Sequence, residues 1–168
     1  MYPYEFWATF LGSPRFAEGW QERYHITYED LEIPGTGERL TEATFAQYRE
    51  DNLLAVAHAI PADDVVTGLQ SPFVMLGSDA ILEPDNNNHP RSTGCFTRTL
   101  GHYVREDKVL PLMEALAKMT ILPARRLEAR APALRRKGRL QRGADADITV
   151  FDPKTVSDTS TVANPAQE

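Results

Sequence analysis

The stretch FVMLGSDAILEPDNNNHPR, from Phe73 to Arg91, decides how the chain is expected to fold. It opens with four apolar residues after Ser71-Pro72, a pattern typical of a strand that is buried on both faces. Asp79 follows directly after this expected strand, and His89 and Arg91 stand at the end of the stretch. In parallel α/β folds, active sites form at the carboxyl ends of the strands, where the connecting loops meet. The stretch therefore predicts a strand and a loop that carries a carboxylate, an imidazole and a guanidinium.

Asp79 and Arg91 also have a purely structural interpretation. Aspartate is a frequent helix cap and turn residue, and arginine side chains are mostly solvated. Under this interpretation, Asp79 caps the next turn and Arg91 lies in solvent. The residue spacing alone does not decide between the two interpretations.

Length and composition exclude several classes of protein. The chain has 168 residues, of which 42% are apolar and 25% charged, as in an ordinary globular domain or a piece of a larger one. Its net charge of -6 gives no general attraction to nucleic acid or to anionic lipid. No apolar stretch is long enough to span a membrane, and the N-terminus has no basic region typical of a secretory signal. We expect a cytoplasmic protein without nucleic-acid or membrane partners.

The remaining segments follow an α/β order. Thr41 is a good helix cap, so a helix is predicted from there to Asp51-Asn52. The apolar run from Leu53 to Ile60 predicts a buried strand, and Trp20 to Tyr28 resembles a surface segment. Further helices are predicted over Pro61–Leu69, Thr93–Arg105 and Val109–Met119 and from Thr120 onward, and two strands are predicted at Gly138–Leu140 and Ala146–Phe151.

Three features could indicate a catalytic or binding role, but a structural role explains each of them more simply. Cys95 is the single cysteine, which excludes an internal disulfide and favours a small buried residue over a nucleophile. His58 lies in an apolar run, which favours a core histidine over a metal ligand. The arginine-rich run from Arg125 to Arg142 lacks interleaved aromatic residues, so a solvated surface is favoured over a nucleic-acid site.

Taken together, the segments resemble the C-terminal part of the amidohydrolase superfamily, of the N-acyl-D-amino-acid deacylase type (D-aminoacylase or N-acyl-D-glutamate deacylase). The resemblance covers nearly the whole chain, and its motifs are individually weak but occur in the family's order. They are Tyr2-Pro3-Tyr4, Val74 to Asp79, His89-Pro90-Arg91, Thr99 to Arg105, Met119-Thr120 with Pro123-Ala124, and Gly143 with Ala146 to Asp152.

The resemblance implies an α/β fold: the last two strands and helices of a (β/α)8 TIM-like barrel, plus strands of a small β-sandwich. The implied division is residues 1–130 as barrel with an insertion at 12–60, residues 131–155 as β-sandwich strands, and residues 156–168 as a flexible tail. The implied activity is zinc-dependent hydrolysis of the amide bond of N-acyl-D-amino acids.

The resemblance also implies residue roles. Asp79 would be the catalytic carboxylate, which takes a proton from water and passes it to the leaving amine, and the one metal-ligand candidate in this chain. Arg91 would bind the substrate's α-carboxylate, because a guanidinium can hold a carboxylate with two hydrogen bonds. The other implied substrate-binding residues are Tyr2, Tyr4 and His89, with Arg15 as a candidate for a second carboxylate and hence for N-acyl-D-glutamate.

The family's other metal ligands have no counterpart here. His25, His58, His89 and His102 are isolated, and one carboxylate does not hold zinc. We therefore expect a fragment that is inactive alone and that would need a complementary N-terminal barrel fragment as its partner. The alternative is a non-catalytic remnant that acts as a binding or scaffold protein through the aromatic segment from Tyr2 to Phe10.

Overall fold

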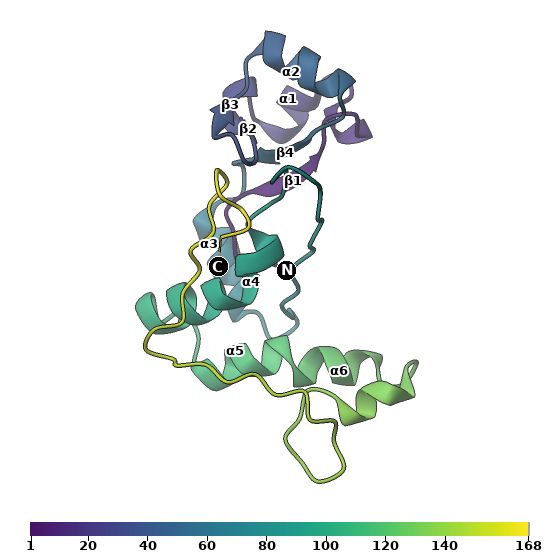
Figure 1. Cartoon of the computed structure of the whole chain (residues 1–168), viewed down its shortest axis with the longest axis vertical. Coiled ribbons are helices and arrows are strands. Elements are labelled where there is room, and N and C mark those ends of the chain that lie inside the picture. The colour runs from purple at the N-terminus through teal and green to yellow at the C-terminus, as the bar shows by residue number, and fades with distance from the viewer. Residues whose placement is uncertain (168) are drawn as a thin grey trace.

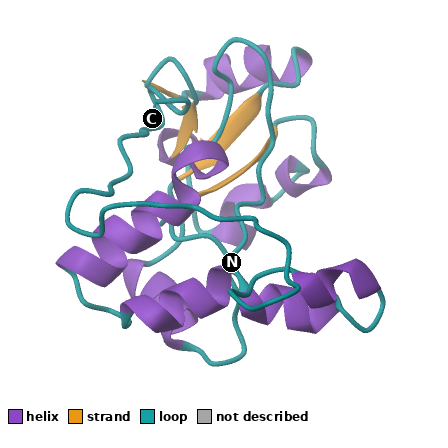
Figure 2. Ribbon diagram, turned by 60° about the horizontal axis from the view of Figure 1, so that its bottom comes forward, coloured by secondary structure: helices purple, strands orange, loops and turns teal. Residues whose placement is uncertain are grey.

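The computed structural model describes residues 1–167 and arranges them in three tiers (Figure 1). A small sheet with two helices forms one end, α3 and α4 lie in the middle near both chain ends, and α5 and α6 form the other end (Figures 1 and 2). The elements are β1 (Trp7–Phe10), α1 (Trp20–Tyr24), β2 (Leu31–Ile33), β3 (Glu38–Arg39), α2 (Glu42–Glu50), β4 (Leu54–Ala57), α3 (Ala62–Gln70), α4 (Arg91–Arg98), the π-helix η3 (Thr99–Glu106), α5 (Leu112–Met119) and α6 (Ile121–Leu127), with 3-10 turns η1 (Pro14–Phe16), η2 (Tyr28–Asp30) and η4 (Pro132–Arg136).

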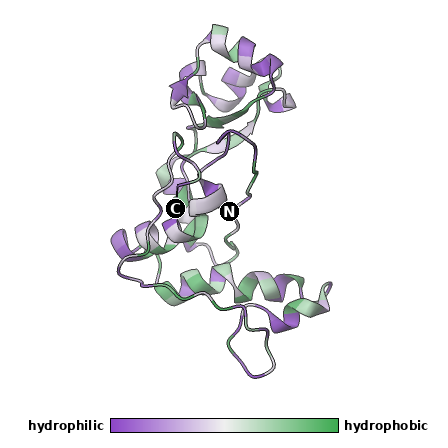
Figure 3. Cartoon of the chain, viewed as in Figure 1, coloured by the Kyte–Doolittle hydropathy of each residue, from purple (hydrophilic) through white to green (hydrophobic). Residues whose placement is uncertain are grey.

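The sheet has four strands in the order β1-β4-β2-β3, and every pair is antiparallel. All four residues of β4 are buried, which confirms the strand predicted within Leu53 to Ile60. Figure 3 shows the hydrophobic character of this central strand. The fold is thus an α/β piece, but its sheet is antiparallel: β2, β3 and β4 lie in the segment 12–60 predicted as an insertion, and β1 lies before it.

An aromatic core fills the space between the sheet and its helices. Trp20 is buried and stacks on Phe45 of α2 with ring centroids 5.4 Å apart. The prediction of a surface segment from Trp20 to Tyr28 was therefore wrong, because the aromatic rings close this core while the charged residues face outward. Thr41 caps α2 with a capping box, as predicted from the sequence.

A second, separate core lies under the middle tier. It is formed by apolar residues of α3, η3 and α5 with Leu76, and it confirms the helices predicted over these segments. Its buried members are Val65, Leu69, Leu76, Tyr103, Leu110 and Ala115. The N-terminal segment is fixed to α4 beside this core, because Arg98 donates from Nε to the carbonyl of Pro3 at 2.8 Å.

The strand predicted at Phe73 is not formed, and the side chain of Phe73 is 89% exposed. A strand requires a neighbouring strand for its backbone groups, and here the backbone contacts with distant segments are with Met1 and Lys118; the N–H of Leu76 donates to the carbonyl of Lys118 at 3.1 Å. The Met1 nitrogen donates to the carbonyl of Met75 and its carbonyl accepts from Gly77, both at 2.9 Å. This pair of hydrogen bonds has the pattern of one parallel bridge between Met1 and Leu76.

The strands predicted at Gly138–Leu140 and Ala146–Phe151 are also absent from the structure. These segments contain residues that favour strands, but no strand among the described residues pairs with them, and Val150 is 91% exposed. The loop is instead held by ion pairs, among them Lys137 with Asp145 at 3.0 Å.

The segment after residue 155 runs back along α4 and η3 toward the sheet (Figure 1). Val162 is buried, its carbonyl accepts from Gly35 at 2.9 Å, and Thr93 donates to the carbonyl of Pro165 at 2.7 Å. These contacts were not expected from the sequence, which predicted a flexible tail at residues 156–168. The tail has no apolar periodicity, so its sequence gives no sign of packing.

Candidate functional site

Asp79 and Arg91 form the centre of the candidate site. Arg91 Nη2 lies 2.9 Å from Asp79 Oδ2, and Arg91 Nε donates to the backbone carbonyl of Asp79 at 2.9 Å. The Arg91 side chain is only 3% exposed, whereas that of Asp79 is 69% exposed. A positive φ of 52° at Asp79 turns the chain here, in the left-handed region where Asp is tolerated better than most residues. The guanidinium is thus the buried part of the site and the carboxylate is its solvent-facing part.

Tyr2 lies over the guanidinium of Arg91. The centroid of its ring is 4.4 Å from the guanidinium carbon, which is a favourable cation–π arrangement. Burial raises the pKa of the Tyr2 hydroxyl, while the nearby charge of Arg91 opposes this rise. The hydroxyl therefore stays protonated at neutral pH and is available to donate to an anion.

His89 is buried directly behind Arg91, with both ring nitrogens bonded to the backbone. Nδ1 accepts from the N–H of Arg91 at 2.9 Å, and Nε2 lies 3.0 Å from the carbonyl of Phe6. A carbonyl only accepts, so the ring proton is assigned to Nε2. Burial lowers the pKa of His89 to about 3. His89 is a neutral imidazole without a free nitrogen for a ligand.

Tyr4 forms a second layer beside His89. It is buried, its ring lies edge-on to His89 at 5.3 Å, and its hydroxyl donates to Asp158 Oδ2 at 2.7 Å. Burial raises the pKa of this hydroxyl. Sequence analysis missed Asp158, because it lies in a polar tail without a motif. The glycine at position 94, within a predicted helix, was the one hint of a close contact there. Any side chain at this position would collide with Asp158 and with the Tyr4 hydroxyl.

Arg15 lies at the margin of the site. Its guanidinium carbon is 5.8 Å from the centroid of the Trp7 ring, and its charge has the smallest of the influences on the pKa of the Tyr2 hydroxyl, which burial raises. The structure thus brings Tyr2, Asp79, His89 and Arg91 together, with Tyr4 and Arg15 around them.

The N-terminal aromatic segment does not form an exposed patch. Tyr4 is fully buried, and Tyr2, Phe6, Trp7 and Phe10 are at least partly covered. The patch expected for a scaffold protein at Tyr2 to Phe10 was therefore wrong, since these rings pack on His89 and on the sheet core.

Residues 1–167 contain no cluster of three or more His, Cys, Asp or Glu side chains that could hold a metal ion. His58 binds Glu32 at 2.8 Å, and His102 lies beside Glu106 and Asp107. Asp79 is therefore the sole candidate ligand near the site in this part of the chain, and the donor set does not fit zinc.

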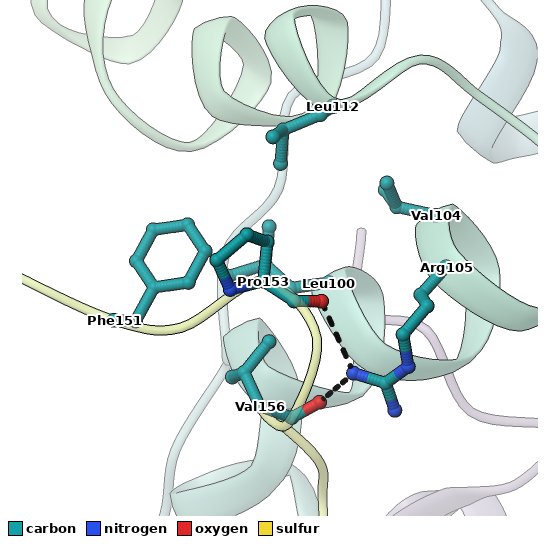
Figure 4. A pocket seen from close by; sticks show the side chains of 7 residues that line it. All are labelled: Leu100, Val104, Arg105, Leu112, Phe151, Pro153 and Val156. Atoms are coloured by element: carbon teal, nitrogen blue, oxygen red, sulfur yellow. Dashed lines mark hydrogen bonds between the residues drawn. The ribbon is translucent and has the colours of Figure 1, made fainter.

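Two other features of the described chain carry no chemistry. Cys95 is buried as predicted, and burial raises the pKa of its thiol to about 12, which disfavours the reactive thiolate. A cavity of about 180 Å³ lies between η3, α5 and the segment around Phe151, and it is apolar apart from Arg105 (Figure 4). The guanidinium of Arg105 is committed to the carbonyls of Pro153 and Val156. These two hydrogen bonds hold the returning segment against η3, and the side chains that line the cavity include no acid and no base other than the guanidinium of Arg105.

The class of protein follows from comparison with known families. The chain belongs to the amidohydrolase family, whose model matches residues 36–167. This confirms the resemblance found in the sequence. No helix in residues 1–167 has the length and apolar character that crossing a membrane requires.

The more specific similarities are to deacylases of D-amino-acid derivatives. The chain is 46% identical over 107 residues to N-acyl-D-glutamate deacylase of Alcaligenes xylosoxydans xylosoxydans, which is 64% of this chain and 21% of that protein. It is 46% identical over 93 residues to D-aminoacylase of the same organism, covering 55% and 18%, respectively. The chain thus spans about a fifth of the length of these relatives.

Solved structures agree. The N-acyl-D-glutamate deacylase of Bordetella bronchiseptica, solved with zinc and a phosphonate inhibitor, superposes with a TM-score of 0.76 at 36% identity over 98% of this chain and 35% of its own. A D-aminoacylase structure gives the same TM-score at 28% identity over 99% and 35%. These similarities give no support for a separate N-terminal fragment as a partner.

Proposed function

We propose that the chain supplies the carboxylate-binding side of the active site in an amidohydrolase that cleaves the amide bond of N-acyl-D-amino acids. The observation that carries the proposal is the contact between Asp79 and Arg91 in a chain related to deacylases of such compounds. The finer fold, the closing strands of a (β/α)8 barrel followed by β-sandwich strands, belongs to the same proposal. Its support is the parallel bridge pattern between Met1 and Leu76.

In this proposal, Arg91 binds the substrate's α-carboxylate. Its Nε donates to the carbonyl of Asp79, but its Nη2 contacts an exposed carboxylate that a substrate carboxylate could replace. Tyr2 stacks on the same guanidinium and would donate its hydroxyl proton to the same anion. Buried guanidinium groups with fixed orientation are well suited to this task, because they bind carboxylates in a defined geometry.

Asp79 would be the acid–base group. A solvent-facing carboxylate can take a proton from an attacking water and deliver it to the leaving amine, and such transfer contributes typically 10²–10⁴-fold in rate, as an order of magnitude. The relatives' zinc has no matching donor set in residues 1–167, so no step through a metal is assigned to this chain. Arg15, near Tyr2, is our candidate for binding the side-chain carboxylate of an N-acyl-D-glutamate.

The proposal is tested by replacing the matching part of the Alcaligenes N-acyl-D-glutamate deacylase with this chain. We expect the chimera to hydrolyse N-acetyl-D-glutamate and to leave the L-enantiomer intact, and Arg91→Gln to raise KM far more than Arg91→Lys. A well-folded chimera whose KM does not respond to Arg91→Gln would refute the role of Arg91. The unmodified chain with added zinc is the matched control, and hydrolysis there would show that its metal donors were misjudged.

A further inference from the structure

The imidazole of His89 connects three parts of the chain at the candidate site. Its ring stacks on Phe6, with centroids 4.7 Å apart, and lies edge-on to Tyr2 at 5.6 Å and to Tyr4 at 5.3 Å. The residue is 1% exposed, so these contacts leave no open face toward solvent. A buried polar ring must satisfy both of its nitrogens within the protein.

The two nitrogens of His89 do so with opposite roles. Nε2–H donates to the carbonyl of Phe6, which ties the ring to the N-terminal segment just before β1. Nδ1 accepts from the backbone N–H of Arg91 at 2.9 Å. The opposite tautomer would place two donors against each other at Nδ1 and two acceptors at Nε2, so this arrangement requires one tautomer.

The bond to Arg91 also completes the start of α4. The first N–H groups of a helix have no partner inside the helix, and the N-cap residue Pro90 supplies no side-chain acceptor. His89 supplies it to Arg91, the first residue of α4. The imidazole therefore determines where the helix begins and where the Arg91 side chain leaves the backbone.

We propose that His89 is a positioning residue, which orients Arg91 for carboxylate binding through the Nδ1 bond and does not touch the substrate. This replaces the direct substrate contact expected from the sequence. The inference rests on the proposed function in one respect, namely that Arg91 is the carboxylate-binding group. The hydrogen bond itself is independent of that function.

The decisive experiment separates the two nitrogens of His89 by two substitutions. In His89→Asn, the amide oxygen can take the position of Nδ1 and accept from the Arg91 N–H, as Asn does in turns. In His89→Gln, the longer amide can reach the carbonyl of Phe6 in place of Nε2, and no acceptor remains for Arg91. The two variants have similar chemistry and differ in which bond they retain.

The first measurement is amide hydrogen exchange at Arg91 in this chain, followed by NMR. We expect His89→Asn to keep the exchange rate within about threefold of the original chain, and His89→Gln to raise it about tenfold, since one hydrogen bond of ordinary strength is lost. Equal protection of the Arg91 N–H in the Gln variant overturns the proposal.

The second measurement is the affinity for N-acetyl-D-glutamate, read from the Arg91 Nε–H signal. We expect Kd to rise about tenfold in His89→Gln and to stay within about threefold in His89→Asn, as loss of one oriented contact implies. Arg91→Gln is the control, read from the Asp79 amide signal. If the original chain shows no carboxylate binding, the proposed function of Arg91 fails, while the exchange measurement still decides the role of His89.

A third readout needs no variant. The nitrogen NMR signals of the His89 ring distinguish the protonated from the unprotonated nitrogen, and we expect the proton on Nε2. A ring with its proton on Nδ1 would contradict the proposed bond directly, even if both variants failed to fold.

Discussion

The carboxylate of Asp79 and the guanidinium of Arg91 lie in direct contact, with Oδ2 and Nη2 2.9 Å apart, although we propose different partners for them during catalysis. Each would release the other when substrate binds, because a substrate carboxylate would take the place of Oδ2 on Nη2. The high exposure of Asp79 makes this exchange inexpensive, since its carboxylate moves into water. Under the proposed function, the pair would therefore link binding of a carboxylate at Arg91 to release of Asp79.

Replacing Asp79 by Asn should affect binding and turnover in opposite directions. In the chimera, we expect kcat to fall by about 10²-fold or more, because an amide cannot accept the proton. In this chain, the affinity of Arg91 for N-acetyl-D-glutamate should rise, since the competing carboxylate is gone. Steady-state kinetics and an NMR titration measure the two effects. Asp85→Asn, which changes an exposed carboxylate of the same loop, is the control and should alter neither.

The hydrogen bond between Tyr4 and Asp158 should contribute measurably to stability. Tyr4→Phe leaves Asp158 without its buried donor, so we expect a loss of about 1–3 kcal/mol in the free energy of unfolding. A double-mutant cycle with Asp158→Asn in urea should give a coupling energy on the order of 1 kcal/mol. Tyr24→Phe is the matched control, because no hydrogen bond of its hydroxyl occurs among the described residues. A zero coupling energy would contradict the contact.

Gly101→Ala should destabilise the chain although alanine favours helices. An added Cβ would lie 2.7 Å from the carbonyl oxygen of Val156 and 3.1 Å from Ser157 Cα, and these backbone atoms must move. We expect a cost of about 1–3 kcal/mol and faster proteolysis of the returning segment. Gly77→Ala adds a Cβ with no atom within 4 Å, so it should be nearly neutral. Equal stability of the two variants would disprove the close approach at Gly101.

The stability should depend on pH through His89. Burial lowers its folded-state pKa to about 3, with Arg91 and His58 adding to the effect, whereas the ordinary value is 6.5. Between these values the unfolded chain binds the proton and the folded chain does not, so this contribution is present above pH 6.5 and is lost as the pH falls toward 3. Relative to His89→Asn, the original chain should lose roughly a few kcal/mol over this window, measured by urea unfolding. Parallel curves for the two proteins would contradict the buried neutral imidazole.

Local signals in the sequence predicted local structure well. The Thr41 cap, the β4 strand and the helices around Thr93–Arg105 follow from capping chemistry and apolar periodicity, which act within a few residues. The proximity of Asp79, His89 and Arg91 also followed, because all three lie in one loop. The roles of these side chains and of Tyr2, Tyr4 and Arg15 remain predictions.

Features that depend on distant partners could not be predicted. The segments at Phe73 and Val150 have strand sequences, but a strand exists only where a neighbour accepts its hydrogen bonds. The orientation of the His89 ring depends on Phe6, and the partner of Tyr4 is Asp158, 154 residues away. No spacing rule connects such pairs. The glycines at 94 and 101 were the available hint, because a helix tolerates glycine poorly without a packing reason.

The register of β1 with β4 places Trp7 opposite Ala57. The chain between these two residues therefore leaves the rest of the protein and returns to it at the paired ends of β1 and β4. This segment has its own aromatic core. The segment between Trp7 and Ala57 could therefore be replaced, because a short turn or a hairpin from another protein could connect the two paired strand ends. A graft must reproduce two attachments: the N–H of Gly35 donates to the carbonyl of Val162, and the backbone of Leu54 forms two hydrogen bonds with the side-chain amide of Asn87 and so holds the loop that carries His89 and Arg91.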